Sequence, residues 1–331
     1  MFRDILKLMD EDLIVDGNRT EIELVIENSA KKIIESLEEN EEEEISRVVS
    51  DNDEFIKRNR LRWAVGFRKL RALRAVCLEA GMSFQKLILG IPEFENDELI
   101  GVFMRQHAHA CRISGEIIHL LEGGYPDAAL ARWRTLFEMV VTCLVIKKHG
   151  REAAIDYIKH GMVKNAEGIE EHKKTAAEMR CETFTDEEVE RAKELKAEFS
   201  GGEENWHWAR KYAGASQFGK LRDHVGLGKW SHNYKLASRN IHSDYFEMAS
   251  LLGMREAKFD ALLSGQSNSG FTDPAHFTAI SLSTITSIFI TSYIENESNK
   301  LDYSDSVLFL KIIEHYVREV GESFLAVEEA I

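Results

Sequence analysis

The sequence predicts an all-α protein, a helical bundle, and three observations support this class. Only three prolines occur in 331 residues, while Ala, Leu, Glu and Lys, which favour helices, are abundant. Sustained alternation of apolar and polar residues, which marks a half-buried strand, is lacking. Apolar residues recur instead at the three- and four-residue spacings of amphipathic helices. A chain of this length, 44% hydrophobic, forms one large domain or two ordinary ones.

The N-terminal part of the chain is expected to contain two amphipathic helices, over about residues 20–39 and 53–81. Ile91 then precedes Pro92, and proline disfavours helix at the residue before it. We therefore predict an N-terminal helical module over residues 1–91.

Residues 92–331 are expected to form a helical bundle domain that carries the site. The domain begins with a pair of helices over residues 101–124 and 125–150. Gly123 and Gly124 lead into Pro126, and glycine closes a helix as readily as proline opens one. The short connection predicts that the two helices are antiparallel neighbours. Later helices are expected over about residues 151–180 and 186–199, from near His232, and over about residues 274–296 and 304–330.

Five polar and charged residues recur on one stripe of the first helix of this pair. Their spacings are four, three, four and three, which places them on one face of an α-helix. We expect this face to be buried, where charged side chains are seldom found unless they are paired or functional. Arg105 and His109 are the exception, since they more often form a solvated edge of such a stripe. The stripe is the best pointer to a site, and its members are Arg105, His109, Arg112, Glu116 and His119.

Arg134 and Glu138 lie four residues apart in the second helix, inside an apolar run. Arg112 and Glu116 have the same spacing, and both pairs can form ion pairs on a helix face. Since the two helices are expected to be neighbours, the two pairs are predicted to meet in one cluster. Two interpretations stay open, because such a cluster either fixes the register of the helices or forms a functional site.

A later helix is predicted to carry Ser238 and His242, four residues apart and within hydrogen-bonding reach. A Ser–His pair suggests nucleophilic catalysis, but no G-x-S-x-G sequence precedes Ser238, and such a serine more often orients the imidazole. Arg239 suits an anionic ligand such as phosphate. His160 and Trp208 are further binding candidates. His160 either reaches the cluster or lies on a helix surface, and Trp208 either stacks on a base or packs in the core.

Charge and cysteine content limit the class of protein. A net charge of −15 argues against broad, non-specific nucleic-acid binding, although residues 57–74 are locally basic. The four cysteines form no CxxC pair, so a cysteine zinc site is not expected. The N-terminus is too acidic for a signal peptide, and residues 275–294 contain many Ser and Thr residues, so we interpret them as a buried helix. A cytoplasmic protein without membrane contact is expected.

Glu-x-x-His occurs twice, at Glu116–His119 and at Glu204–His207. Paired motifs of this kind bind di-iron or di-manganese in helical bundles, and Glu138 could add a further carboxylate. The motif also arises by chance in a chain rich in Glu. Our leading prediction therefore contains no metal and no cofactor.

The sequence CRISGEIIHLLEGGYPDAALARWRTLFE, followed by KHGREAAIDYIKH and YKLASRNIHSDY, resembles an uncharacterised bacterial domain-of-unknown-function family over about residues 100–250. Arg134, Glu138, Ser238 and His242 fall on the family's R-x-L-x-E and Ser-x-x-x-His blocks. The pattern is also similar to the AbiV-type abortive-infection proteins, which are allied with HEPN domains. This resemblance implies a HEPN-like core, a role in defence against phage with RNA as the target, and a homodimer.

The resemblance departs from the HEPN ribonucleases at one motif. Those enzymes use R-x4-6-H, whereas only two residues separate Arg239 from His242. His242 would therefore need an arginine from another helix, such as Arg134.

Three functions remain open from the sequence. The leading prediction is a metal-independent ribonuclease or effector in bacterial defence or stress response. Arg134 would bind phosphate, Glu138 would orient it, and His242 would act as acid and base. The alternatives are a non-catalytic helical module, whose basic helix at residues 57–74 contacts a protein partner, and a carboxylate-bridged di-metal protein. The predicted binding residues are Arg112, Glu116, Ser238, Arg239, His160 and Trp208.

Overall fold

The computed structural model describes residues 19–242, 245, 251–258, 262–293 and 303–330, apart from the side chains of residues 19–22 and 242. Helices form the regular structure of these residues, and no strand occurs among them. The predicted all-α class is therefore confirmed, while a HEPN-like core stays a prediction. The chain divides into two compact units, Met1–Arg58 and Asn59–Ile331.

The first unit contains α2 (Arg19–Glu39) and most of α3 (Glu41–Arg62). Four glutamates occupy the first turn of α3, where the positive end of the helix dipole favours negative charge. The second unit begins at Asn59, whose buried side-chain amide donates hydrogen bonds to the carbonyl oxygens of Leu121 and Glu122. The two compact units divide at residue 58. The domain boundary expected at residue 91 stays a prediction.

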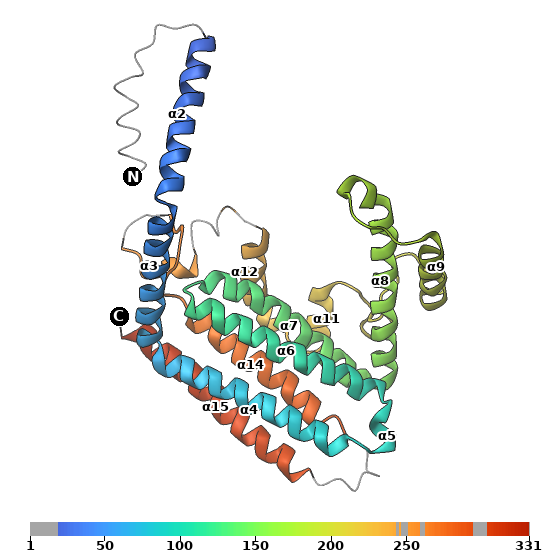
Figure 1. Ribbon diagram of the computed structural model, residues 1–331. Coiled ribbons are helices and arrows are strands. Elements are labelled where there is room, and N and C mark those ends of the chain that lie inside the picture. The colour runs from blue at the N-terminus through green and yellow to red at the C-terminus, as the bar shows by residue number, and fades with distance from the viewer. Residues whose placement is uncertain (1–18, 243–244, 246–250, 259–261, 294–302, 331) are drawn as a thin grey trace. The chain divides into compact units, whose positions relative to one another are not determined.

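The second unit is organised around α14 (Thr272–Ile290), which packs against four long helices. These are α4 (Ala64–Ile88), α6 (Glu98–Glu122), α7 (Pro126–His149) and α15 (Ser304–Glu329), and they run alongside α14 in Figure 1. Most side chains of α14 are buried, as expected for a core helix. In the part of the chain that is described, no helix has the length and apolar character needed to cross a membrane.

The turn between α6 and α7 has the predicted form. Gly124 has a φ of 85°, in the left-handed region that favours glycine, and Pro126 is the first residue of α7. The carboxylate of Asp127 accepts hydrogen bonds from the backbone N–H groups of Leu252 and Gly253. These bonds tie a later loop to the turn, and α6 and α7 pack against each other as expected.

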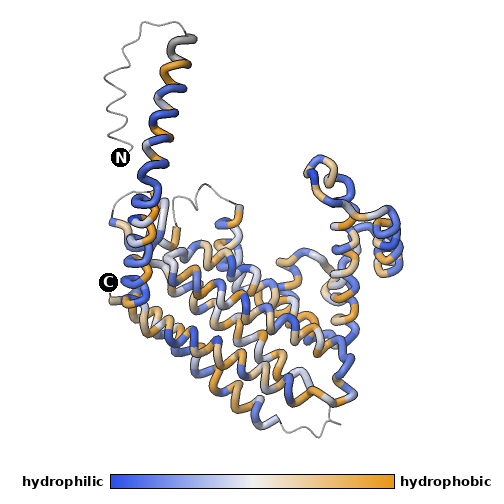
Figure 2. The backbone as a smooth tube through the Cα atoms, viewed as in Figure 1, coloured by the Kyte–Doolittle hydropathy of each residue, from blue (hydrophilic) through white to orange (hydrophobic). Residues whose placement is uncertain are grey.

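The chain between α7 and α14 begins with a helical hairpin of α8 (Arg151–Met179) and α9 (Asp186–Ser200), which pack together. Thr185 and Glu188 form a capping box at the start of α9, and Figure 2 shows this helix mostly in hydrophilic colours. Shorter elements complete the unit: α5 (Pro92–Glu95), α10 (Arg210–Ala213), α11 (Phe218–His224), η1 (Gly228–Trp230), α12 (Ser231–His242) and η2 (Leu252–Met254).

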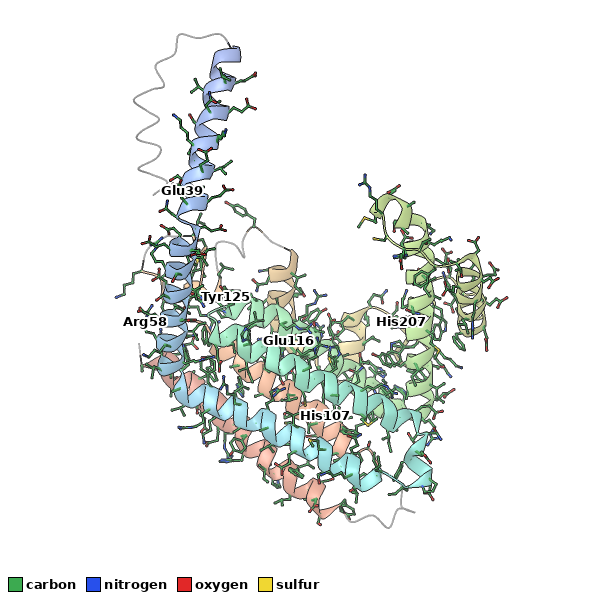
Figure 3. The ribbon with its side chains drawn as sticks, in the orientation of Figure 1. Glu39, Arg58, His107, Glu116, Tyr125 and His207 are labelled. Carbon is green, nitrogen blue, oxygen red and sulfur yellow. The ribbon has the colours of Figure 1, made fainter. Side chains whose placement is uncertain are left out.

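His107 lies on the buried side of α6 and belongs to the core (Figure 3). It is 5% exposed, and its ring stacks on Phe289 with the centroids 5.2 Å apart. Its Nε2 lies 3.1 Å from the carbonyl oxygen of Cys77. Burial lowers the pKa of His107 to about 4, although the hydrogen bond to Cys77 opposes the shift. Cys77, Cys111 and Cys143 are free and buried, as expected for reduced core thiols.

We expect stability to depend on pH through His107. In the unfolded chain this imidazole binds a proton at an ordinary pKa of about 6.5, but in the fold it stays neutral down to about pH 4. The stabilisation is therefore complete above about pH 6.5 and is lost as pH falls toward 4, by about 3 kcal/mol for this group. Urea unfolding over this pH range should show a shallower dependence for His107→Phe than for the wild type. His119→Phe, on the exposed side of α6, is the control, and equal slopes in all three proteins would contradict the prediction.

Candidate functional site

The charged stripe of α6 faces solvent. The solvated edge expected at Arg105 and His109 is confirmed, and the expectation that the rest of this face is buried is wrong. Arg105, His109, Arg112 and His119 are exposed, and Glu116 is half-buried. The reason is that α6 packs against α4, α7, α8 and α14 and leaves the stripe as its outward side. In the sequence of α6, apolar residues flank the stripe on both sides, and this pattern led to the expectation that the stripe is buried.

Glu116, labelled on α6 in Figure 3, forms ion pairs with two arginines from two helices. Its carboxylate lies 3.3 Å from Nε of Arg112 and 2.5 Å from Nε of Arg132 on α7. The hydrogen bond from Arg132 is the largest cause that lowers the pKa of Glu116. The predicted Arg112–Glu116 pair is confirmed, but its partner on α7 is Arg132 rather than Arg134. The sequence contained a signal for this, because Glu116 and Arg132 lie equally far from Gly124 in the turn.

Arg134, Glu138 and Tyr234 form a second cluster, between α7 and α12. Nε of Arg134 donates hydrogen bonds to Oε1 of Glu138 at 3.0 Å and to the hydroxyl oxygen of Tyr234 at 3.1 Å. The hydroxyl of Tyr234 donates to the same Glu138 oxygen at 2.6 Å, and the guanidinium lies over the Tyr234 ring, 5.2 Å from its centroid. The predicted Arg134–Glu138 pair is confirmed. It does not merge with the Arg112–Glu116 pair, because Arg132 and Arg134 emerge on different sides of α7.

The guanidinium of Arg134 is partly buried, and among the described residues only its Nε donates hydrogen bonds. Its side chain is 24% exposed. Burial lowers the pKa of Arg134, but hydrogen bonds and charge interactions with Tyr234 and Glu138 outweigh it, so the net shift is upward. Burial and the bond to Glu138 likewise raise the pKa of Tyr234. Within the described residues, neither Nη1 nor Nη2 of Arg134 donates a hydrogen bond. The cluster therefore fixes a charged guanidinium through Nε, while its two terminal nitrogens have no partner among the described residues.

The residues of α12 are placed only in part. Ser238 donates its hydroxyl to the carbonyl oxygen of Tyr234 at 2.8 Å, so it bonds backward along the helix. His242 is the last residue of α12, and its side chain lies outside the described residues. Tyr234, Ser238 and His242 follow one another at spacings of four, so they share one face of α12. Arg239 is exposed on that helix.

His160 and Trp208 lie in a group of rings between α8 and the loop before α10. Trp208 is buried and packs edge-on against Tyr157, so it is a core residue. His160 lies 4.6 Å, between ring centroids, from His207, and its Nε2 is buried without a hydrogen-bond partner. Burial lowers the pKa of His160 to about 4. No contact links either residue to the Arg134 cluster among the described residues, and Figure 3 shows His207 beside α8.

Sequence reasoning missed a second histidine pair and the role of Tyr234. Nε2 of His149, at the end of α7, lies 2.9 Å from Nε2 of His224 on α11, so one ring donates and the other accepts. The aromatic side chain of Tyr212 packs on His149 and donates its hydroxyl to Asp156 at 2.6 Å. The His149–His224 bond joins α11 to the end of α7, and the Tyr212–Asp156 bond joins α10 to α8. For Tyr234, the available signal was its position four residues before Ser238.

The Glu-x-x-His motifs do not come together as a metal site. Glu116 is bound by two arginines, His119 is exposed, and His207 lies beside His160. The residues that the structure describes contain no group of three or more His, Cys, Asp or Glu side chains placed to hold a metal ion.

Comparison with known proteins gives one match. A protein family described as "Family of unknown function (DUF5677)" matches residues 101–259, which include α6, α7 and α12 and thus the Arg134 cluster. No curated protein and no solved structure matches the chain. The expected similarity to an uncharacterised family is confirmed, and the similarity to AbiV-type and HEPN proteins stays a prediction.

Proposed function

We propose that this protein binds RNA at Arg134 and cleaves it without a metal ion. One observation carries the proposal, namely that Arg134 is fixed through Nε while its two terminal nitrogens are left without a described partner. Arginine presents paired N–H groups that match two oxygens of a phosphate. A guanidinium already held in place loses less conformational entropy when it takes up such a ligand.

Each residue of the cluster has a part in this proposal. Arg134 binds the phosphodiester and stabilises the negative charge that builds up on it during the reaction. Glu138 and Tyr234 are positioning residues that hold the guanidinium. His242 acts as the base. It takes the proton from the ribose 2′-hydroxyl, the 2′-oxygen bonds to the adjacent phosphorus, and the bond from phosphorus to the 5′-oxygen breaks. Water supplies the proton to the leaving 5′-oxygen, and a 2′,3′-cyclic phosphate remains.

Tyr234 and His242 belong to the same helix, α12, which packs on α7 and bonds to Arg134 through Tyr234. His242 lies eight residues after Tyr234, about 12 Å along the axis. The 2′-hydroxyl and the phosphorus that it attacks belong to one nucleotide step, so the proposed reaction requires the imidazole of His242 to extend back along α12 toward Arg134. A role in bacterial anti-phage defence, with RNA as the target, is part of the proposal because the resemblance to abortive-infection proteins implies it.

The test is cleavage of single-stranded RNA by the purified protein in EDTA. The wild type is expected to yield products that end in a 2′,3′-cyclic phosphate, and His242→Ala is expected to lose that activity while its thermal unfolding is unchanged. Equal cleavage by both proteins would remove His242 from the mechanism. Cleavage that appears only when metal ions are restored would replace the metal-independent reaction, and no cleavage by the wild type would overturn the proposed activity.

A further inference from the structure

A second feature of the bundle is a partly to fully exposed arginine face over α4, α6, α7 and the end of α3. The face is defined by six arginines. Arg60 comes from the end of α3, Arg71 and Arg74 from α4, Arg105 and Arg112 from α6, and Arg132 from α7. α4 packs against α6, and α6 packs against α7, so five of the side chains lie on adjoining helices. Arg60 is joined to them by its ion pair with Glu122 of α6. The stripe of α6 forms the middle of this face.

Two glutamates hold four of these arginines in fixed positions. Glu122, whose side chain is 5% exposed, forms ion pairs with Arg60 and Arg71, while both arginines remain more than half exposed. Glu116 likewise forms ion pairs with Arg112 and Arg132. Each carboxylate therefore orients two guanidinium groups and neutralises only one charge.

The other two arginines are held by backbone oxygens. Nε of Arg74 donates to the carbonyl oxygen of Cys111 at 2.9 Å, and Nη1 of Arg105 donates to that of Gly101 at 2.9 Å. Among the described residues neither pairs with a carboxylate, so both keep their full charge. The six arginines and two glutamates together carry a net charge of +4, on a chain whose net charge is −15.

The arginine face ends on α7, the helix that also carries Arg134. Nη1 of Arg132 donates to the hydroxyl of Thr135 on the same helix at 3.4 Å. Arg132 lies on the side of α7 that meets α6, and Arg134 lies on the side that meets α12. A strand bound along the face thus has to cross only α7, a helix about 10 Å wide, to reach Arg134.

We infer that the arginine face binds the phosphate backbone of single-stranded RNA and leads the strand to Arg134. The inference rests on the proposed function, because it identifies the substrate as a strand several nucleotides long. Guanidinium groups suit phosphates better than isolated ammonium groups do, and all six cations here are arginines. A series of fixed positive charges along a surface matches a backbone with regularly spaced negative charges.

The test measures how RNA affinity depends on salt. Binding of a labelled single-stranded RNA of about 20 nucleotides is followed by fluorescence anisotropy over a range of salt concentrations. Arg105→Ala/Arg112→Ala removes two exposed arginines without touching the core. If both contact phosphates, the slope of log affinity against log salt should become shallower by about 1.4, and affinity at about 0.1 M salt should fall roughly 20-fold. Lys311→Ala/Arg318→Ala on α15 removes the same charge outside the face and should change neither quantity.

Three results would overturn the inference: an unchanged slope in the Arg105→Ala/Arg112→Ala protein, an equal change in the α15 control, or displacement of RNA by polyglutamate as effective as by unlabelled RNA. The last result would indicate an acidic protein as the partner.

A dinucleotide substrate separates this inference from the proposed function, since it is too short to span the face. Normal dinucleotide cleavage with an unchanged salt slope removes only the arginine face. A salt slope that responds as predicted, with no cleavage of any RNA, removes only the proposed reaction.

Discussion

Trp133→Ala is expected to lower the free energy of unfolding by about 4 kcal/mol, since alanine in place of a buried tryptophan leaves a large cavity. Trp133 is fully buried at the centre of α7, and its ring packs on Phe277 with the centroids 5.0 Å apart. Its Nε1 donates to the carbonyl oxygen of Phe277 and to the hydroxyl of Ser281 on α14. The substitution removes these contacts together, and Ser281 loses its partner in the core.

The measurement is thermal and urea unfolding of the variant beside the wild type. A loss of about 4 kcal/mol should lower the melting temperature of a unit of this size by roughly 10 °C. Trp206→Ala is the matched control, because Trp206 is only partly buried and packs on His160 near the hairpin. It should lower the melting temperature much less. If the two variants melted at the same temperature, Trp133 would not be the central packing residue.

The starts of α5 and α7 and the turn before α7 could be predicted because local residues set them. The break between α3 and α4 at Trp63, inside the helix expected over residues 53–81, was not predicted. Pro92 and Pro126 each stand at the first position of a helix, and Gly124 turns the chain between α6 and α7. Such signals act within a few residues of the chain, so they are visible in the sequence. Asn59, the first residue of the second unit, instead bonds to the end of α6, far away in the sequence. A contact between residues more than sixty positions apart leaves no local signal.

The candidate site could be predicted only where it follows helical spacing. The Arg134–Glu138 and Arg112–Glu116 pairs were visible because four residues make one turn. Tyr234 was not, since it meets Arg134 only when α12 packs on α7. The exposure of most of the α6 stripe was predicted wrongly for a related reason. Periodicity shows which residues share a face, but the packing of other helices decides which face stays open.

The largest functional effect is expected from Arg134→Ala. Loss of a group that stabilises the charge of the transition state costs on the order of 100-fold to 1000-fold in rate, and we expect cleavage of a dinucleotide to fall by that amount. Folding should be little affected, because Tyr234 and Glu138 keep the hydrogen bond between them. Tyr234→Phe should have a smaller effect, since Glu138 still holds Nε of Arg134. Arg134→Lys keeps the charge but not the paired N–H groups, so it should not restore activity.

The matched control for Arg134 is Arg62→Ala. Arg62 is 23% exposed, pairs with Glu256 at 2.8 Å, and lies over an aromatic ring, that of Trp63, at 5.3 Å. Its surroundings thus repeat those of Arg134 outside the site, and the loss of stability in the two variants should be similar while cleavage falls only in Arg134→Ala. Millimolar guanidinium should restore part of the activity of Arg134→Ala, because it can occupy the space left by the side chain. If the cluster only stabilises the fold, guanidinium should not restore activity. An equal loss of activity in both variants, with no restoration by guanidinium, would therefore assign the cluster to the fold alone.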